Sequence, residues 1–268
     1  LKLTKKILKE KKFLHFLKVI AFLQNIFNNT FIEINQRGIF IRQLNDSGSV
    51  TVDIALLRHN FVHYRMDSEE PIRFGIQSRM FYLTLKDIKK TDGIRMKYDE
   101  DAQDPLVIEY IPKDGSRGIS TALNVHVNVQ SVIIELPEPE MYNDPVTFTS
   151  PEFQKTIKSF GNLGNPNKRI EALTNGRFIT LSAESDAIYS RNGYFGDTSE
   201  GEGLENEIIG TFQFSRLSKL AKLSGLGEIM RIYCSEIYPT LIETPIGHLG
   251  YARVYVKTEE DIQACDED

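Results

Sequence analysis

Cationic side chains recur at helical spacing in four separate segments of the sequence. The candidate nucleic-acid contacts are Lys11, Lys18, Lys86, Lys89, Lys90, Lys155, Lys158, Arg216, Lys219 and Lys222. Side chains three or four positions apart share one face of a helix. Lysines on any single helix ordinarily serve solubility, but here all four segments carry them in a chain with a net charge of −5. Helices gathered on one side of the molecule would sum these charges into a surface suited to a polyanion.

These cations come without an element that reads bases. The sequence contains no zinc-finger spacing, no helix-turn-helix signature and no basic run interleaved with stacking aromatics, and tryptophan is absent. The expected contacts therefore go to the phosphates of duplex DNA, independent of base sequence and weakened by salt.

Motifs for catalysis, metals or cofactors are poor by comparison. His59 and His63 are four positions apart, but the helical metalloprotease motif needs a glutamate where this chain has Asn60. The Gly-Glu-Gly sequence at 201–203 begins like a dinucleotide fingerprint, yet it lies in an acidic stretch with no helix start to meet a phosphate. Neither a GxSxG elbow nor a GxxxxGK[ST] loop occurs. We therefore expect a binding protein that is not an enzyme, with no catalytic residue, no metal and no cofactor.

The composition is that of an ordinary folded protein of one or two domains, with 41% hydrophobic and 26% charged residues. Charge is segregated, because residues 1–20 carry seven lysines and one glutamate while residues 259–268 carry six acids. Cys234 and Cys265 have neither CxxC spacing nor histidines nearby, which favours a reducing compartment. The apolar stretch 13–34 is interrupted by Lys18 and several amides, so we expect an amphipathic helix and no membrane span.

Hydrophobic periodicity predicts an α+β fold. Helices are expected near 13–27, 83–88, 153–160 and 217–223, with Ser150 as the cap of the third. Apolar and polar residues alternate in most of what remains. The expected strands are 31–41, 50–56, 94–98, 106–110, 178–183, 229–233 and 250–256.

The sequence repeats itself roughly half a chain length apart. Segment 34–41 resembles 173–180, and the pair 94–98 and 105–109 is echoed by 229–233 and 239–243. We expect two structurally repeated domains, each with two helices packed on antiparallel sheet. The predicted boundaries are an N-terminal domain over 1–123, a connector over 124–145, and a C-terminal domain with an acidic tail over 146–268. Prolines between acids at 135–140 favour an extended connector.

Nine short segments, in this order and spacing, carry a resemblance to a known family. They are GIFI at 38–41, LNDS at 44–47, VTV at 50–52, FVHYR at 61–65, LPEPE at 136–140, SPEF at 150–153, TF at 211–212, PTLI at 239–242 and GYARVYV at 250–256. On these residues the chain resembles the sliding clamps of the proliferating cell nuclear antigen family.

The resemblance implies a DNA clamp fold in which three chains close head to tail into a ring. The helices would line the hole with their basic faces inward, and closure would pair sheet edges that a single chain leaves open. It implies a homotrimer that encircles duplex DNA, is placed there by a clamp loader, and acts in the nucleus or in a viral replication compartment. We expect the subunit contacts near 121–129 and 185–190.

The same resemblance implies a docking platform for DNA polymerase and for other replication and repair proteins. Such partners insert a short peptide into an apolar pocket beside the connector. The peptide forms one helical turn and places aliphatic and aromatic side chains in the pocket. The corresponding residues are Leu44, Val50, Ile134, Leu136, Pro239, Tyr255 and Val256. The alternative for each of them is ordinary core packing.

Several segments depart from the family pattern. Val256-Lys257-Thr258 stands where members usually carry Ala-Pro-Lys, the lysine-rich 5–12 obscures the first strand, and 191–207 is long and acidic. These features indicate a divergent member. A heterotrimeric checkpoint-type clamp, a monomeric processivity factor and an unrelated enzyme are the alternatives.

Overall fold

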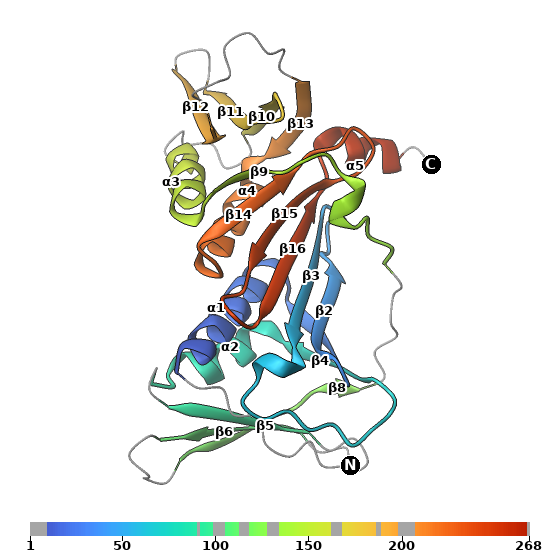
Figure 1. The fold of residues 1–268 in the computed structure, drawn as a ribbon, viewed down its shortest axis with the longest axis vertical. Coiled ribbons are helices and arrows are strands. Elements are labelled where there is room, and N and C mark those ends of the chain that lie inside the picture. Colours follow the sequence, from blue (N-terminus) through green and yellow to red (C-terminus); the bar gives the residue numbers. More distant parts are fainter. Residues whose placement is uncertain are drawn as a thin grey trace. The chain divides into compact units, whose positions relative to one another are not determined.

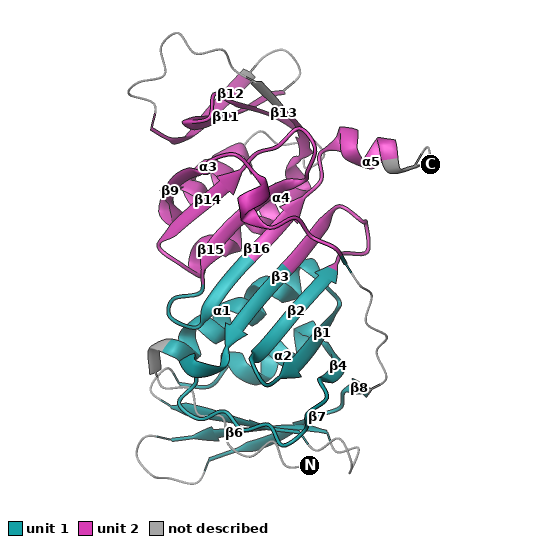
Figure 2. Cartoon of the chain, turned by 45° about the vertical axis from the view of Figure 1, so that its right-hand side comes forward, with its two compact units in different colours: residues 1–43, 53–134, 246–252 teal, residues 44–52, 135–245, 253–268 magenta. Residues whose placement is uncertain are grey.

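The computed structural model describes residues 10–89, 92–98, 105–112, 118–127, 134–161, 168–185, 189–197 and 207–266. The chain divides into two compact units that interleave along the sequence (Figure 2). Unit 1 comprises residues 1–43, 53–134 and 246–252, and unit 2 comprises residues 44–52, 135–245 and 253–268. These units are defined by compactness, so the domain boundaries read from the sequence repeat stay a prediction.

The first half of the chain begins with a long helix and ends with a short strand (Figure 1). Its elements are α1 (Glu10–Ile26), β1 (Asn29–Asn35), β2 (Gly38–Leu44), β3 (Val50–Leu57), η1 (Arg58–Asn60), β4 (Ile72–Gln77), α2 (Ser78–Lys86), β5 (Gly93–Lys97), β6 (Leu106–Ile111), β7 (Ser120–Leu123) and β8 (His126–Val127).

The second half follows the same plan and ends with a helix. Its elements are η2 (Pro139–Met141), β9 (Val146–Thr149), α3 (Ser150–Gly161), β10 (Arg169–Thr174), β11 (Phe178–Ser185), β12 (Tyr189–Gly196), β13 (Glu207–Gln213), α4 (Phe214–Leu220), η3 (Ala221–Gly225), β14 (Ile229–Tyr233), β15 (Thr240–Pro245), β16 (Gly250–Val256) and α5 (Glu259–Asp266).

Strand order shows that the two halves are copies of one module. In the first half β4-β1-β2-β3 are neighbours in that order, and in the second half the matching strands β13-β10-β11-β12 are neighbours in the same order. After the second helix of each copy, β5-β6-β7 matches β14-β15-β16. The predicted fold class, two repeated α+β modules with antiparallel sheets, is confirmed.

The first hairpin of each copy is built by the same local chemistry. The side-chain oxygen of Asn35 accepts a hydrogen bond from the backbone N–H of Arg37 at 2.8 Å, and that of Asn175 accepts one from Arg177 at 3.1 Å. An asparagine side chain that holds the backbone two residues on favours a turn. This turn divides the stretch 31–41, so the prediction of one strand there is wrong and β1 and β2 are separate strands.

Two copy-related strands, β3 and β16, are also neighbours in a sheet. Within unit 1 the backbone N–H of Leu57 donates to the carbonyl of Leu249 at 2.9 Å, and within unit 2 that of Lys257 donates to Ser49 at 3.0 Å. Gly250 is required here, because a Cβ at this position would lie 1.8 Å from the carbonyl oxygen of Ala55 on β3.

The helices bury the predicted apolar stripes. Phe13, Phe16 and Ile20 of α1, and Phe153 and Ile157 of α3, are all buried. In each copy the first helix packs on the second, α1 on α2 and α3 on α4 with η3. Among the described helices, none combines the length and apolar character needed to cross a membrane.

The start of α3 differs from its prediction. Thr149 and Glu152 bond reciprocally, each backbone N–H donating to the other's side-chain oxygen at 3.4 Å. This is a capping box, so the cap is Thr149 and not Ser150.

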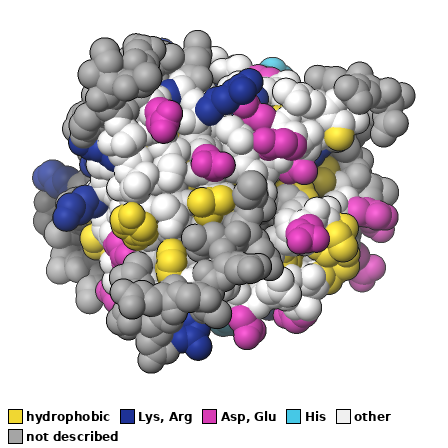
Figure 3. All heavy atoms as spheres, turned by 90° about the horizontal axis from the view of Figure 1, so that it is seen from above, with side chains coloured by type: hydrophobic (Ala, Val, Ile, Leu, Met, Phe, Trp, Pro, Cys, Tyr) yellow, Lys and Arg dark blue, Asp and Glu magenta, His cyan; other side chains and the backbone are white. Residues whose placement is uncertain are grey.

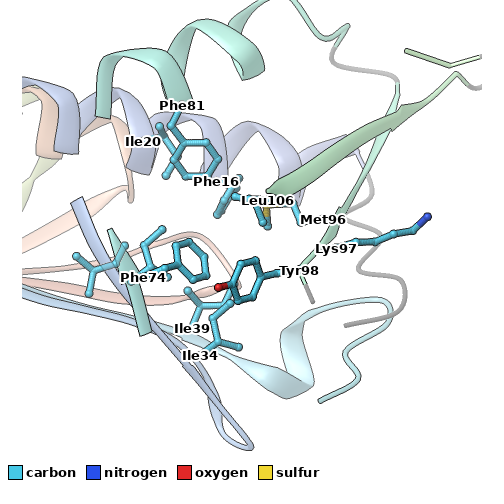
Figure 4. Close-up of a pocket in the computed structure, with 12 residues that line it drawn as sticks. Phe16, Ile20, Ile34, Ile39, Phe74, Phe81, Met96, Lys97, Tyr98 and Leu106 are labelled. Atoms are coloured by element: carbon cyan, nitrogen blue, oxygen red, sulfur yellow. The ribbon is translucent and has the colours of Figure 1, made fainter. Parts of the chain in front are cut away.

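The core of unit 1 contains a cavity of about 30 Å³ between α1 and the sheet (Figure 4). Phe16, Ile20, Phe74, Phe81 and Tyr98 are among the side chains that line it, and the lining is almost wholly apolar. A space of this size accommodates about one water molecule, so we place no ligand there.

Candidate nucleic-acid interface and docking pocket

The two helices of unit 2 present four exposed lysines. Lys155 and Lys158 lie one turn apart on α3, and Lys219 on α4 and Lys222 on η3 are likewise three residues apart. Because α3 packs directly on α4 and η3, these side chains belong to one helix pair. The predicted spacing on a shared helical face is thus present in unit 2.

The helices of unit 1 match the prediction less closely. Lys18 on α1 is half-buried, and Lys86 is exposed in the last turn of α2. Lys89 is exposed but follows the end of α2. Lys11 belongs to α1, but its side chain lies outside the described part of the structure, as does the whole of Lys90.

Arg79 and Arg216 each lie on the second helix of a copy, α2 and α4. Arg216 on α4 is half-buried, and one of its terminal nitrogens is enclosed without a hydrogen-bond partner among the described residues, so it differs from the exposed lysines. Sequence reasoning missed Arg79, which is exposed in the first turn of α2. It stands seven positions before Lys86, and that two-turn spacing was the available signal.

Charge is unevenly distributed over unit 2. Figure 3 shows basic side chains at the left edge and also at the upper centre, while acidic side chains lie in the centre and at the right edge. Glu152 is the sole acid in the sequence of α3, α4 and η3. Long lysine side chains on such a surface suit loose contacts with many phosphates in turn.

A second candidate site lies in unit 2, where the connector meets the C-terminal strands. Tyr233, Leu241 and Tyr255 form a buried apolar cluster, and Leu136 and Tyr142 of the connector pack against it. The Tyr142 ring contacts the rings of Tyr233 and Tyr238, with centroids 5.9 Å and 5.6 Å away. The site therefore offers an apolar and aromatic wall beside a half-buried leucine.

Tyrosine hydroxyls fix the connector in place. Tyr255 donates to the carbonyl of Pro137 at 2.9 Å, and Tyr142 donates to the carbonyl of Pro239 at 2.8 Å. Burial raises the pKa of the Tyr142 hydroxyl, and neighbouring Tyr255 and Tyr238 add to the effect, so it remains a donor at neutral pH.

An ion-pair network adds a third attachment of the connector. Arg253 bonds Glu138 of the connector at 2.6 Å and Glu243 of β15 at 2.9 Å. The Arg253 side chain is 15% exposed, and it bridges the half-buried strand position and the connector surface. These contacts hold the connector against the apolar cluster in one arrangement.

The predicted pocket residues differ in exposure. Leu44 is 42% exposed, Leu136 and Pro239 are half-buried, and Val50, Tyr255 and Val256 are buried. Ile134 is half-buried and belongs to unit 1. The structure brings Leu136 and Tyr255 together, while the role of the other predicted members stays a prediction.

Sequence reasoning missed Tyr142, Tyr233 and Leu241 in this cluster. Tyr233 and Leu241 are directly opposite each other on β14 and β15. Arg231 and Glu243 stand two residues from Tyr233 and Leu241, on the same face of each strand, so alternation along the strands gave no signal for this pair.

The alternative chemistry of the sequence gains no support from the described residues. His59 and His63 are both exposed, and only His59 belongs to a helical turn, η1. No group of three or more His, Cys, Asp or Glu side chains in the described ranges is placed to hold a metal. The Gly-Glu-Gly sequence at 201–203 lies outside those ranges.

The chain is similar to known sliding-clamp sequences. Residues 8–130 match the family model described as the N-terminal domain of proliferating cell nuclear antigen. The chain is 21% identical to the proliferating cell nuclear antigen of Caenorhabditis elegans, with 91% of this chain and 93% of the relative covered. It is 20% identical to the probable DNA polymerase sliding clamp 1 of Paramecium bursaria Chlorella virus 1, over 85% and 87% of the two chains.

Solved structures show the same fold over nearly the whole chain. A chain from the PCNA2–PCNA3 complex of Sulfolobus tokodaii gives a TM-score of 0.77 at 17% identity, covering 97% of this chain and 99% of its own. Proliferating cell nuclear antigen from Entamoeba histolytica gives 0.76 at 20% identity, covering 96% of both.

Proposed function

We infer that this chain, a divergent member of the proliferating cell nuclear antigen family of sliding clamps, encircles duplex DNA and serves as a processivity factor for a DNA polymerase. The observation that carries the function is the duplicated module, in which each copy pairs two helices, with exposed cations on α2, α3, α4 and η3. Contacts to phosphates alone leave a clamp free to move along the duplex. We assign it no catalytic step.

The strand correspondence supports ring closure. Among the described strands, β7 and β12 each stand at the end of a sheet. Their counterparts in the other copy are β16 and β3, and those two strands are paired within the chain. We propose that β12 of one chain pairs with β7 of the next in the same way, head to tail, and that three chains close the ring.

The cluster around Leu136 and Tyr255 is the proposed docking pocket. Its walls are apolar and aromatic, and tyrosine hydroxyls hold the connector against them. We propose that a short helical peptide of a polymerase, or of another replication or repair protein, inserts its aliphatic and aromatic side chains there. A clamp loader is the further partner, and the nucleus or a viral replication compartment is the proposed location.

The decisive experiment tests topology. The purified protein is loaded onto nicked circular DNA and washed at high salt, and the circle is then linearised. Retention on the circle and release after linearisation are expected, since an encircling ring slides off an end. Equal retention before and after linearisation would indicate ordinary electrostatic binding and overturn the proposal.

A heterotrimeric clamp is the second candidate, because a structural neighbour of this chain comes from a complex of two different clamp chains. The mass of the purified protein in solution distinguishes the homotrimer from the heterotrimer. A three-chain mass at micromolar concentration supports the homotrimer, while a monomer that forms rings only with other clamp chains supports the heterotrimer.

A further inference from the structure

The outer edge of one strand, β4 in the first copy and β13 in the second, has a different neighbour in each copy of the module. In the first copy β8 pairs with β4 at Phe74 and Gly75. These residues stand four and three positions before α2 begins at Ser78. In the second copy Gly210 and Thr211 of β13 stand four and three positions before α4 begins at Phe214. The edge that receives a strand in the first copy therefore has an equivalent in the second.

The helix α5 covers that equivalent edge. A carboxylate oxygen of Glu260 accepts a hydrogen bond from the backbone N–H of Thr211 at 3.0 Å. Thr258 lies against Gly210, where a Cβ would come within 2.5 Å of the threonine methyl carbon. Gly210 also has a φ of +140°, so glycine here permits both the backbone conformation and the close approach of α5.

Position along the chain supports the correspondence. The strand β8 starts three residues after β7 ends, and α5 starts three residues after β16 ends. Since β7 and β16 are counterparts, β8 and α5 are the trailing segments of the two copies. One is a strand that pairs through its backbone, and the other is a helix that makes its contacts with side chains.

The described contacts of α5 with β13 and β10 use side chains of α5 throughout. Thr258 and Asp261 cap the helix reciprocally at 2.8 Å and 3.0 Å, and Glu259 pairs with Arg169 of β10 at 2.8 Å. The Arg169 side chain is 72% exposed, so solvent screens this ion pair and it holds the helix only weakly. A strand that supplies backbone carbonyls and N–H groups to β13 would form a regular ladder in place of these contacts.

We propose that the edge of β13 is a strand-pairing site for an extended segment of a docked partner, and that α5 covers this edge in the free protein. The proposal rests on the docking function proposed above. Thr258 lies two residues beyond Val256, a predicted pocket residue, and already touches β13. A partner peptide seated in the pocket thus needs few additional residues to reach the edge.

Two synthetic peptides test the proposal against the intact ring. The short peptide is one helical turn with aliphatic and aromatic plugs, and the long peptide adds Thr-Val-Thr-Val, tested at each end. In a chain that ends at Lys257, the short peptide should bind with the same affinity as to the full chain. The better of the two long peptides should bind about tenfold more tightly to the truncated chain, because it adds two or more hydrogen bonds. Hydrogen exchange at the Thr211 amide should speed up after truncation and slow again only with the long peptide.

A point variant keeps the test informative if truncation harms folding. Glu260→Ala should raise the hydrogen-exchange rate of the Thr211 amide and increase the affinity for the long peptide. Gln263→Ala, at an exposed position of the same helix, should change neither. Methylation of the backbone nitrogens in the extension should abolish the gain. If the long peptide gains nothing, or gains equally when methylated, the strand-pairing site is overturned. If neither peptide binds, the docking pocket itself fails, and the two results are therefore distinguishable.

Discussion

The helix faces and the proposed docking pocket of unit 2 hold their side chains in opposite ways. Lys155 and Lys158 are exposed on α3, with charged ends free to move through solvent. Leu136, in contrast, packs on a buried cluster, and Tyr255 is 3% exposed and hydrogen-bonded to Pro137. One surface is built from long flexible cations, and the other from fixed apolar and aromatic groups.

This difference matches two kinds of binding. A clamp that moves along DNA needs many weak and interchangeable contacts, which flexible lysines supply through phosphates. Recognition of a particular peptide needs a wall whose shape is set before binding, because pre-organisation lowers the entropic cost. Under the proposed function, the same unit would slide on one ligand while it holds another.

The largest expected effect comes from reversing charge on the helix pair. Changing Lys155, Lys158, Lys219 and Lys222 to glutamate turns four attractive contacts with phosphates into repulsive ones. Stimulation of DNA synthesis should fall by roughly 100-fold at moderate salt, since each phosphate contact contributes to binding. The mass of the ring and the short peptide's affinity should not change.

A matched control uses exposed arginines away from the four helices. Arg65→Glu and Arg177→Glu alter charge in a loop and in a hairpin turn. They should leave DNA synthesis within about twofold of the original protein. Full activity of the quadruple lysine variant would remove these helices from the DNA interface.

A smaller effect is expected from the pocket wall. Leu136→Ser removes an apolar side chain that packs on the Tyr233 and Tyr255 cluster. It should lower the affinity for the short peptide by about 10- to 30-fold, as measured by calorimetry. Leu44→Ser should cost less, because Leu44 is already 42% exposed. Ile237→Ser is the control, since Ile237 is 84% exposed and does not belong to the cluster. Loss of the ring in the Leu136 variant would show that this residue is structural.

Sequence periodicity was enough to predict the repeated α+β module, the four helical segments and about half of the described strands, because those features are set by local pattern. It failed where a side-chain hydrogen bond turns the backbone, as at Asn35, which separates β1 from β2. The helix α5 was read only as an acidic tail, although Thr258 and Asp261 form its cap. Its apolar content is low, so periodicity gave no signal and a tertiary contact with β13 supports it.

The candidate sites were predicted unevenly for a similar reason. Cation spacing located Lys155 and Lys158 because both are set by one helix. The pocket cluster joins the connector, β14, β15 and β16, so Tyr142, Tyr233 and Leu241 are brought together only by the sheet. Contacts between segments distant in sequence have no local signature.

A modest effect is expected from the hydroxyl that anchors the connector. Tyr255→Phe keeps the ring but removes the hydrogen bond to the Pro137 carbonyl, which is worth about 1 kcal/mol. The affinity for the short peptide should fall about fivefold, and hydrogen exchange at the connector amides should become faster. Tyr142→Phe removes the bond to Pro239 and should act similarly. An unchanged exchange rate in both variants would show that packing alone fixes the connector.

The smallest effect is expected at the exposed end of the Arg253 network. Glu138 is 59% exposed, so Glu138→Gln should change the short peptide's affinity by no more than about twofold. Glu243 is 14% exposed and pairs with both Arg231 and Arg253, so Glu243→Gln leaves a buried guanidinium less well compensated. Its melting temperature should therefore fall further than that of the Glu138 variant. Equal melting temperatures would contradict the idea that the inner half of the network, between Arg253 and Glu243, is what fixes the pocket wall.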